Sequence, residues 1–313
     1  MELEAKIYVA GHTGLIGSAV VNCLQTVGFD NLLTRPHNEL DLIEQSSVRE
    51  FFEREQPEYV VLAAGKVGGI AANSRYPADF IYTNLVIQTN VLEAARQSAM
   101  KRLIFFGSSC MYPVQASQPM KEQELFDGKL EQTSVAYAVS KIAGMQTCLA
   151  FNQQENGRRF IPVIPNSTYG ENDNLNPESG HVLSALVRRF DDAKNNGEKS
   201  IQLWGSGRPR REFVHSSDVA DACLRILKAD LSSTELPINI GTGEDISIKA
   251  LAEVIGEITG FQGSIEWDLL RPDGVARKLL DNQRIRDLGW RPSVDLRGGI
   301  TRFYRWYRSQ GLH

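Results

Sequence analysis

The sequence predicts an α/β fold built on a doubly wound parallel sheet, followed by a smaller, mixed α/β carboxy-terminal lobe. Two observations carry this prediction. In the first half of the chain, apolar runs of strand length alternate with amphipathic segments of helix length. In the second half the alternation loosens, and glycine, asparagine and proline cluster over residues 166–180.

The alternation can be followed element by element. An apolar run at residues 6–10 predicts a strand, and the helical spacing of apolar positions over residues 15–27 predicts a helix. The elements predicted next are a strand at 31–34, a helix at 46–55, a strand at 59–63, a helix at 78–99, a strand at 102–107, a helix at 135–156 and a strand at 160–164. This order, with right-handed crossovers, gives a parallel sheet. In the second half we predict turns at 205–209 and 241–245 and helices at 249–259 and 297–307.

Composition and charge exclude several classes of protein. The 313 residues are 42% hydrophobic and 23% charged, and a formal net charge of −4 does not suit a nucleic-acid-binding protein. The four cysteines, at positions 23, 110, 148 and 223, form no CxxC pair, so neither a metal site nor a disulfide framework is expected. We find no secretory signal and no apolar stretch near the roughly 20 residues of a membrane span, so a reducing, cytoplasmic setting is expected.

A glycine-rich turn, Gly11-His12-Thr13-Gly14-Leu15-Ile16-Gly17, lies between the first predicted strand and the first predicted helix. Glycine allows a tight turn and close approach to a pyrophosphate, and the helix amino terminus offers N–H donors. A turn without a ligand is the alternative, but this placement favours a dinucleotide site. Residues 1–165 are therefore predicted to form a Rossmann-like cofactor domain. Residues 166–313 are predicted to be mainly a substrate-binding lobe, with some chain returning to the first domain.

The end of the second predicted strand bears on the choice of cofactor. An acidic residue there usually binds the ribose 2′-hydroxyl of NAD. Here the strand ends with Arg35, Pro36 and His37, and Arg35 can instead pair with the 2′-phosphate of NADP. We therefore predict NADP(H), the alternative being that Arg35 is a solvated surface charge. Asp41 and Leu42 follow at a spacing suited to an adenine contact.

Tyr137 and Lys141 are four residues apart and so share one face of a predicted helix. A cation beside tyrosine favours the phenolate, so the phenol can donate a proton near neutral pH. Ser108 follows a predicted strand, where ligands of doubly wound sheets bind, and can hydrogen-bond the same carbonyl oxygen. These are the parts for hydride transfer at a carbon–oxygen centre. Structural packing is the alternative for Tyr137 and Lys141.

Cys110 and His181 form a second candidate pair. A thiolate in an electropositive pocket is a competent base, and imidazole titrates near neutral pH. A 4-ketone acidifies the hydrogens on both neighbouring carbons, so epimerisation needs a base on one face of the sugar and an acid on the other. From the residues alone, a buried apolar cysteine and a helix-start or core histidine remain equally good interpretations.

These motifs resemble the extended short-chain dehydrogenases/reductases and, within them, the GDP-L-fucose synthases, over nearly the whole chain. The segments that carry the resemblance are GHTGLIGSA (11–19), KVGGI (66–70), YPADFIYTN (76–84), GSSCMYP (107–113), YAVSKIAGM (137–145), HVLSALVRRF (181–190), WGSGRPRREFVH (204–215) and PDGVARKLLD (272–281). KVGGI followed by YPADFI is far more selective than the glycine turn or the YxxxK spacing.

The resemblance implies a role for each matching residue. For reduction it implies the triad Ser108, Tyr137 and Lys141. For epimerisation it implies Cys110 as base and His181 as acid. The substrate contacts that it implies are Arg189, Trp204, Arg211 and Lys278, of which Lys278 reaches the nucleotide diphosphate. The cofactor contacts that it implies are Gly11, Thr13, Gly14, Leu15, Ile16, Gly17, Arg35, Asp41, Leu42, Tyr137, Lys141 and His181. A solvated face or a turn is the alternative for Arg189 and Arg211.

The chain departs from the family pattern at several positions. Thr13 stands where many members carry an arginine that reaches the 2′-phosphate, and His37 where some carry a second arginine. Ser179-Gly180 replaces a common asparagine-serine pair, and Val275-Ala276 replaces threonine-proline near the substrate lobe. A related GDP-sugar, a colitose precursor or a deoxyheptose, is therefore an alternative substrate.

We predict an NADP-dependent oxidoreductase and epimerase that converts GDP-4-keto-6-deoxy-D-mannose to GDP-L-fucose without a metal. One alternative is a redox-neutral, NAD-dependent nucleotide-sugar 4-epimerase, whose chemistry needs neither Cys110 nor His181. Another is a non-catalytic nucleotide-sensing protein. Besides the GDP-sugar, a second copy of the chain is the expected partner, because helices 78–99 and 135–156 can form a dimer bundle. No nucleic-acid or membrane partner is expected.

Overall fold

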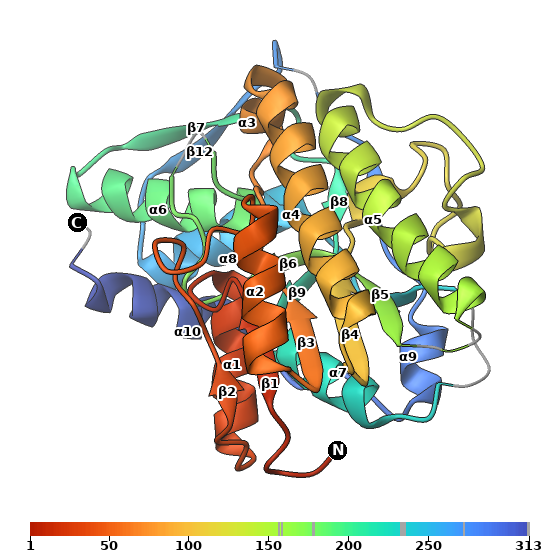
Figure 1. The fold of residues 1–313 in the computed structure, drawn as a ribbon. Helices are drawn as coiled ribbons and strands as arrows, with labels where there is room; N and C mark the ends of the chain where they lie inside the picture. Colours follow the sequence, from red (N-terminus) through yellow and green to blue (C-terminus); the bar gives the residue numbers. More distant parts are fainter. Residues whose placement is uncertain (156, 158, 177–178, 232–235, 272, 312–313) are drawn as a thin grey trace.

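The computed structural model describes residues 1–155, 157, 159–176, 179–231, 236–271 and 273–311. Its centre is a six-stranded parallel sheet, which confirms the predicted doubly wound α/β fold (Figure 1). In spatial order the strands are β10 (Ile238–Ile240), β5 (Phe160–Pro165), β4 (Arg102–Phe106), β3 (Tyr59–Leu62), β1 (Ile7–Ala10) and β2 (Leu32–Leu33).

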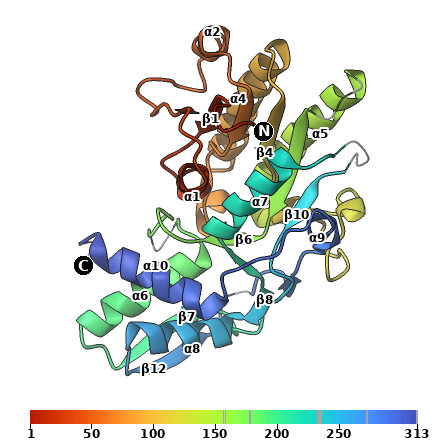
Figure 2. The same cartoon turned by 90° about the horizontal axis from the view of Figure 1, so that it is seen from below.

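Helices cover both faces of this sheet, because the strand side chains alternate between two hydrophobic cores. On one face Ile7 and Val9 share a core with residues of α1 (Leu15–Thr26) and α7 (Ser216–Lys228). On the other face Tyr8 and Ala10 share a core with residues of α2 (Gln45–Glu55), α4 (Pro77–Gln97) and α5 (Val135–Gln154). Figure 2 shows these two helical layers on either side of the strands. A parallel sheet requires apolar side chains on both faces in this way.

The order of the strands fixes where a ligand can bind. After β1 the chain adds β2 on one side and then crosses over to place β3 on the other side of β1. The loops that follow β1 and β3 therefore diverge at the carboxyl edge of the sheet and leave a crevice between them, where doubly wound folds bind their ligands.

A third hydrophobic core lies in the second half of the chain. Three helices contribute to it: α6 (Val182–Asn195), α8 (Ile248–Thr259) and α10 (Leu296–Ser309). The short strands around it form three small sheets: β11 (Ile246–Ser247) with β8 (Arg210–Arg211) and β13 (Arg277–Lys278), β12 (Ser264–Asp268) with β7 (Ser200–Trp204), and β6 (Ser167–Tyr169) with β9 (Phe213–His215). The remaining short helices are α3 (Ile70–Arg75), η1 (Ser109–Met111), η2 (Glu122–Glu124), η3 (Gln132–Ser134) and α9 (Gln283–Asp287).

The structure adds elements that the sequence pattern did not predict, chiefly α6, α7 and β10. The first turn of α7 is Ser216-Ser217-Asp218, residue types that favour caps and turns over helix interiors. It is stabilised by the His215 side chain, which accepts a hydrogen bond from the Ser217 backbone N–H, and by packing against α1. The predicted strand at 31–34 is shorter than expected, with two residues. None of the described helices has both the length and the hydrophobicity that crossing a lipid bilayer requires.

Candidate active site

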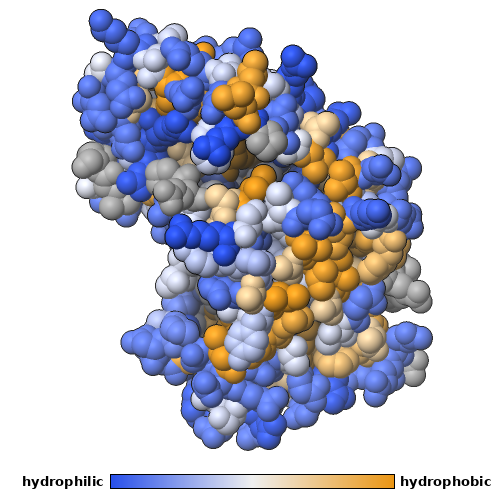
Figure 3. All heavy atoms as spheres, turned by 90° about the horizontal axis from the view of Figure 1, so that it is seen from above, coloured by the Kyte–Doolittle hydropathy of each residue, from blue (hydrophilic) through white to orange (hydrophobic). Residues whose placement is uncertain are grey.

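A cavity of about 810 Å³ opens at the carboxyl edge of the large sheet and is lined by residues from both halves of the chain. In Figure 3 the molecular surface is hollowed between the two halves. The predicted site residues that line the cavity are Gly11, Thr13, Gly14, Leu15, Ile16, Ser108, Cys110, Tyr137, Lys141, His181, Trp204, Arg211 and Lys278. The structure thus brings together residues that are far apart in sequence.

Gly17 and Arg189 are the two predicted site residues that line neither this cavity nor the smaller one beside it. Gly17 lies in the first turn of α1, where the missing side chain lets the helix approach the Gly11 and His12 backbone. Arg189 belongs to α6, and only the beginning of that helix, with Val182, Leu183 and Ala185, borders the cavity. Because Arg189 lies one turn beyond Ala185, the structure does not place it with the other predicted substrate contacts.

The glycine turn has the close packing that a pyrophosphate site needs. Gly11 has a φ of +80°, and a Cβ atom there would lie 2.7 Å from the Ala64 backbone nitrogen. At Gly17 a Cβ atom would lie 2.1 Å from the Gly11 carbonyl oxygen. Gly14 caps α1 without any side-chain hydrogen bond. The first N–H groups of α1 are therefore available to an anion at the edge of the cavity.

A second cavity of about 370 Å³ adjoins the glycine turn and is lined by the predicted residues Arg35, Asp41 and Leu42. Thr13 lines both cavities. The Arg35 guanidinium donates to Glu55 Oε1 at 3.2 Å and lies 5.7 Å from the centre of the Phe51 ring. Held in this way, Arg35 and Thr13 border the same space, as recognition of a ribose 2′-phosphate requires.

Ser108 and Tyr137 are joined by a side-chain hydrogen bond on the cavity wall. Ser108 is fixed by a second contact, because its Oγ accepts the Cys110 backbone N–H at 3.3 Å. Burial raises the pKa of Tyr137, the neighbouring Cys110 raises it further, and the Ser108 hydrogen bond only partly opposes them. The lower pKa that a neighbouring cation was expected to give this phenol is not seen here, because burial dominates. A protonated phenol is the state that a proton donor needs.

Lys141 is a buried cation on the same wall. Its Nζ lies 5.2 Å from the centre of the Phe105 ring and 5.9 Å from that of Tyr137. Burial lowers the pKa of Lys141 to about 8. Among the described residues no carboxylate forms an ion pair with it, so its charge is available to a polar ligand in the cavity.

Cys110 faces two cations from the second half of the chain. Lys278 Nζ lies 3.9 Å from Cys110 Sγ and 3.6 Å from Glu131 Oε2. Burial lowers the pKa of Arg211, whereas the charges of Glu131, Cys110 and Asp273 raise it. Arg211 is therefore close enough to Cys110 and Glu131 to interact with both electrostatically. All four cysteines are free thiols. A thiol beside cations is the arrangement in which cysteine can act as a base.

His181 stands at the amino-terminal cap of α6, and a buried carboxylate holds its ring. The Nδ1 atom lies 3.1 Å from Asp173 Oδ1. Burial disfavours the charged imidazole of His181. The hydrogen bond to Asp173 and the negative charge of Asp173 outweigh this effect, so the pKa of His181 is raised. The imidazole is therefore biased towards its protonated, acidic form.

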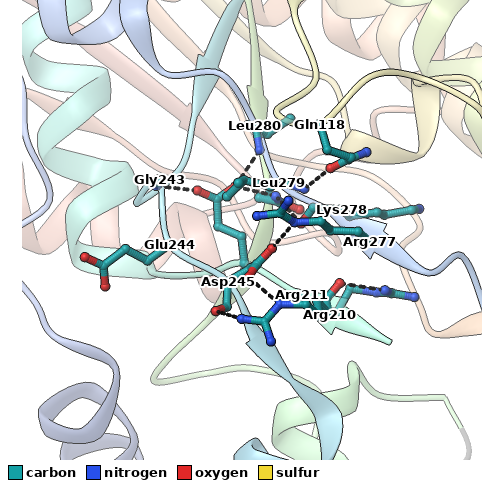
Figure 4. Close-up of polar contacts among 12 residues, drawn as sticks. Gln118, Arg210, Arg211, Gly243, Glu244, Asp245, Arg277, Lys278, Leu279 and Leu280 are labelled. Carbon is teal, nitrogen blue, oxygen red and sulfur yellow. Dashed lines mark hydrogen bonds and ion pairs between the residues drawn. The ribbon is translucent and has the colours of Figure 1, made fainter. Parts of the chain in front are cut away.

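In the small sheet of β8, β11 and β13, four cationic side chains lie as two pairs on opposite faces. β13 pairs with β8 in parallel, with Arg277 opposite Arg210 and Lys278 opposite Arg211. Successive residues of a strand point to opposite faces. Arg210 and Arg277 therefore both bind Asp245 on one face, as Figure 4 shows, whereas Arg211 and Lys278 line the cavity on the other.

A buried carboxylate holds the same sheet against the rest of the protein. Glu212 Oε1 accepts the Gly243 N–H at 2.6 Å, and its Oε2 accepts the Leu280 N–H at 3.0 Å and a hydrogen bond from Asn166, a residue of the cavity wall. Burial raises the pKa of Glu212, although these hydrogen bonds oppose it. Glu212 thereby fixes the position of its neighbour Arg211.

The sequence prediction missed Asp173 and Glu131. Asp173 lies in an asparagine-rich turn and Glu131 precedes a short helix, so neither belongs to a regular pattern. Acidic residues ahead of His181 and Tyr137 were the only available signal, and such residues are common in loops. In the described part of the chain, no three His, Cys, Asp or Glu side chains come together as a metal site requires. The cavity instead offers a dinucleotide cradle, a proton donor, a thiol and an imidazole.

Comparison with known proteins identifies relatives of this chain. It matches the family described as "NAD dependent epimerase/dehydratase family" over residues 7–241. It is 50% identical to GDP-L-fucose synthase 1 of Arabidopsis thaliana over 97% of this chain and 93% of that protein. It is 42% identical to the GDP-L-fucose synthase of Escherichia coli (strain K12), over 97% of each. Among solved structures, it is 41% identical to a GDP-mannoheptose C4 reductase from Campylobacter jejuni with NADP bound, with a TM-score of 0.89 over 98% of this chain and 99% of that chain.

Proposed function

This chain belongs to the GDP-L-fucose synthases within the NAD-dependent epimerase/dehydratase family, and we propose that it epimerises and then reduces a GDP-linked 4-keto-6-deoxy sugar with NADPH. Its preferred substrate is GDP-4-keto-6-deoxy-D-mannose, and the product is GDP-L-fucose. The observation that carries this proposal is that one cavity holds Cys110 and His181 together with Ser108 and Tyr137. Reduction alone needs the second pair, and epimerisation accounts for the first.

The described residues fit NADP(H). The uncapped start of α1 and the closely packed Gly11 offer a cradle for the pyrophosphate. Arg35 and Thr13 border the smaller cavity, where the 2′-phosphate is expected, and Asp41 and Leu42 lie beside them. The Campylobacter jejuni relative is a complex with NADP, which supports the same cofactor here. When bound, NADPH supplies hydride to C4 of the sugar.

Epimerisation uses the thiol and the imidazole. Cys110 removes a proton from a carbon beside the 4-ketone, and the electron pair of the broken C–H bond moves onto O4 as an enolate. Ser108 and Tyr137 hydrogen-bond that oxygen, where negative charge develops. His181 returns a proton to the carbon from the other face, so the configuration inverts. Inversion at both C3 and C5 requires the enolate to form twice, with the sugar ring moving between the two events.

Reduction uses the tyrosine as the acid. Tyr137, kept protonated by burial, donates its proton to O4 as hydride arrives at C4. Lys141 supplies a buried positive charge beside the phenol, which stabilises the tyrosinate that forms. Arg211 and Lys278 are suited to the diphosphate of the GDP-sugar, because they lie in register on the cavity face of the small sheet.

A turnover assay in deuterated water tests the proposal. NADPH oxidation, product stereochemistry and deuterium positions are measured together, with several GDP-4-keto sugars. We expect one NADPH per turnover, deuterium at the inverted carbons and a fucose-type product. Tyr137→Phe, which keeps the ring volume, should lower reduction by orders of magnitude with the fold intact. Turnover without net NADPH consumption would instead identify a redox-neutral 4-epimerase.

A second candidate substrate is a GDP-linked 4-keto heptose. The observation that favours it is the similarity to a GDP-mannoheptose C4 reductase over almost the whole of both chains. Val275-Ala276 and Ser179-Gly180 also depart from the family pattern near the cavity. A kcat/KM for the heptose above that for the 6-deoxyhexose would favour this substrate.

We further propose a cytoplasmic homodimer. Helices α4 and α5 lie side by side and leave Tyr82 and Val139 exposed, at 63% and 40%. Hydrophobic side chains also gather on the face seen in Figure 3, where α3 and the first turns of α4 and α5 lie. Pairing of α4 and α5 with those of a second copy would bury these side chains, and Tyr82→Glu should then shift the protein to a monomer in sedimentation. Free thiols suit a reducing compartment.

We also propose that the two segments of the chain bind different ligands. Residues 1–165 hold the cofactor, and residues 166–313 mainly bind the sugar nucleotide. Strand β10, helix α7 and residues such as Val214, Ile285 and Trp290 of the second segment pack with the cofactor-binding sheet.

A further inference from the structure

We propose that Asp173 is a positioning residue for His181, which holds the imidazole with its proton on Nδ1 and leaves Nε2 for the substrate. The inference rests on the proposed function, in which His181 is the acid of epimerisation.

The Asp173 carboxylate is buried and uses both oxygens. Oδ1 accepts the His181 ring N–H at 3.1 Å and the Asn174 backbone N–H at 2.8 Å. Oδ2 accepts the Ser184 hydroxyl, and Ser184 is fully buried in α6, one turn after His181. The carboxylate therefore ties the loop before α6 to the first turn of that helix. Because Nδ1 is engaged, the tautomer with a free Nε2 is selected.

The loop that carries Asp173 is fixed from both ends. Beside Asp173, the Asn172 amide donates to Ser18 Oγ in α1 at 3.0 Å. At its far end the Ser179 carbonyl accepts the Gly69 backbone N–H at 2.8 Å. A Cβ atom on Gly180 would lie 2.3 Å from the Asn174 carbonyl oxygen, so Gly180 also packs closely against Asn174. Asp173 thus has a defined position, as orienting a catalytic ring within a fraction of an ångström requires.

Asp173 also sets the charge of the ring. Its hydrogen bond and its negative charge raise the pKa of His181 against the opposing effect of burial. None of the other described titratable groups of the cavity wall contributes to this shift: Cys110, Glu131, Tyr137, Lys141, Arg211, Asp273 and Lys278. One carboxylate therefore provides both the orientation and the protonation state that an acid needs.

The test compares Asp173→Asn, which keeps the shape of the side chain, with Ser184→Ala, which keeps the carboxylate and its His181 contact. The imidazole is titrated by NMR in wild type and both variants, with His181→Asn used to assign its signal. We expect the midpoint of His181 to move to lower pH in Asp173→Asn and to stay near the wild-type value in Ser184→Ala. An unchanged midpoint in Asp173→Asn would overturn the proposal.

Solvent-deuterium uptake into the sugar supplies a second readout. In Asp173→Asn the alkaline limb of its pH profile should move to lower pH, with a loss of about tenfold or more at pH 8. NADPH oxidation with a 4-keto sugar that needs no inversion should fall less than deuterium uptake, and its alkaline limb should not move. A uniform loss of both reactions, with the pH limb unmoved, would mean that Asp173 is only structural.

The two readouts also separate this inference from the proposed function. If wild type takes up no deuterium, His181 is not the acid of this reaction, while the titration still decides whether Asp173 controls the ring. If Asp173→Asn does not fold, Asp173→Glu takes its place. It should retain a raised midpoint and part of the exchange rate, and a midpoint near that of a free imidazole would overturn the proposal.

Discussion

The ammonium nitrogen of Lys278 lies 3.9 Å from the sulfur of Cys110, although the two residues are 168 positions apart in the sequence. The same nitrogen lies 3.6 Å from Glu131 Oε2. One cation from the second half of the chain thus lies close to both the thiol proposed as the base and a carboxylate. The electrostatics of the thiol therefore depend on how the two halves of the chain meet.

Replacing Lys278 should make Cys110 less reactive. Lys278→Met keeps the length of the side chain but removes the positive charge that stabilises a thiolate, so alkylation by iodoacetamide near neutral pH should slow by about three- to tenfold. The exposed Lys249 offers a matched control, and Lys249→Met should leave the rate unchanged. Cys110→Ser gives the background from the other thiols. If Lys278→Met is alkylated as fast as wild type, the contact has no influence on the sulfur.

Replacing Cys110 should separate epimerisation from reduction. In Cys110→Ser the side chain keeps its shape, but a hydroxyl is a poor base near neutral pH, so deuterium uptake from solvent should fall sharply. Ser108, Tyr137 and Lys141 stay in place, and the 4-keto sugar should be reduced without inversion. Product analysis by NMR should then find a 6-deoxy sugar of the starting configuration. Wild-type rates of exchange and inversion would instead make Cys110 a packing residue and the enzyme a simple ketoreductase.

Replacing Arg35 should alter the choice of cofactor. Arg35→Ala should weaken binding of NADPH more than of NADH, because only NADPH carries the 2′-phosphate, and loss of a charge-assisted contact costs about tenfold or more. Arg54 is a matched control, since its Nε also contacts Glu55 at 3.2 Å but does not line the small cavity. Fluorescence titration of both cofactors against both variants measures the difference. Equal weakening of NADPH and NADH would make Arg35 structural, and Thr13 and His37 the candidates.

Removing the buried charge of Lys141 should lower the activity and raise the stability of the protein. Burial lowers the pKa of Lys141 from its ordinary 10.5 to about 8, so the folded protein carries an ammonium whose burial costs on the order of 3 kcal/mol. Lys141→Met should lower reduction and raise the free energy of unfolding in urea, measured without cofactor near pH 7. The gain should come from the missing buried charge.

The pH dependence of that gain has a definite sign. Between about pH 8 and pH 10.5, folded wild type has lost the Lys141 proton while the unfolded chain still binds it, so wild-type stability rises with pH in this window. The advantage of Lys141→Met should therefore be largest below pH 8 and shrink as pH 10.5 is approached. An advantage that does not vary with pH would show that packing, and not the buried charge, sets the difference.

The fold and the centre of the site follow from local sequence patterns. The glycine turn, the Tyr137–Lys141 spacing and the alternation of apolar runs each depend on neighbouring residues, and the structure brings these motifs to one edge of the sheet. The return of β10 to that sheet depends on pairing with a strand more than seventy positions earlier, and a strand of three residues carries no local information about that pairing. For the same reason the two-residue strands β8 and β13 could not be predicted.

The errors at the site have a common physical origin. Whether Tyr137 is charged depends on how deeply it is buried, and the spacing to Lys141 contains no information about burial. The roles of Asp173 and Glu131 depend on which groups they meet in space, His181 in one case and Lys278 in the other. Arg189 stays a prediction, since a family motif places it among the substrate contacts whereas only the beginning of α6 lines the cavity.

The pairing of β8 with β13 constrains how this segment can vary among related proteins. Arg210 and Arg211 are chemically identical neighbours, and only their strand register sends one to Asp245 and the other into the cavity. Inserting or deleting a single residue just before Arg210 would exchange the faces of Arg210 and Arg211 although both side chains would remain. Over evolutionary time the spacing of this segment should therefore drift less than the identity of its cations. Homologues that replace Arg211 by lysine should be found more readily than homologues whose segment differs by one residue in length.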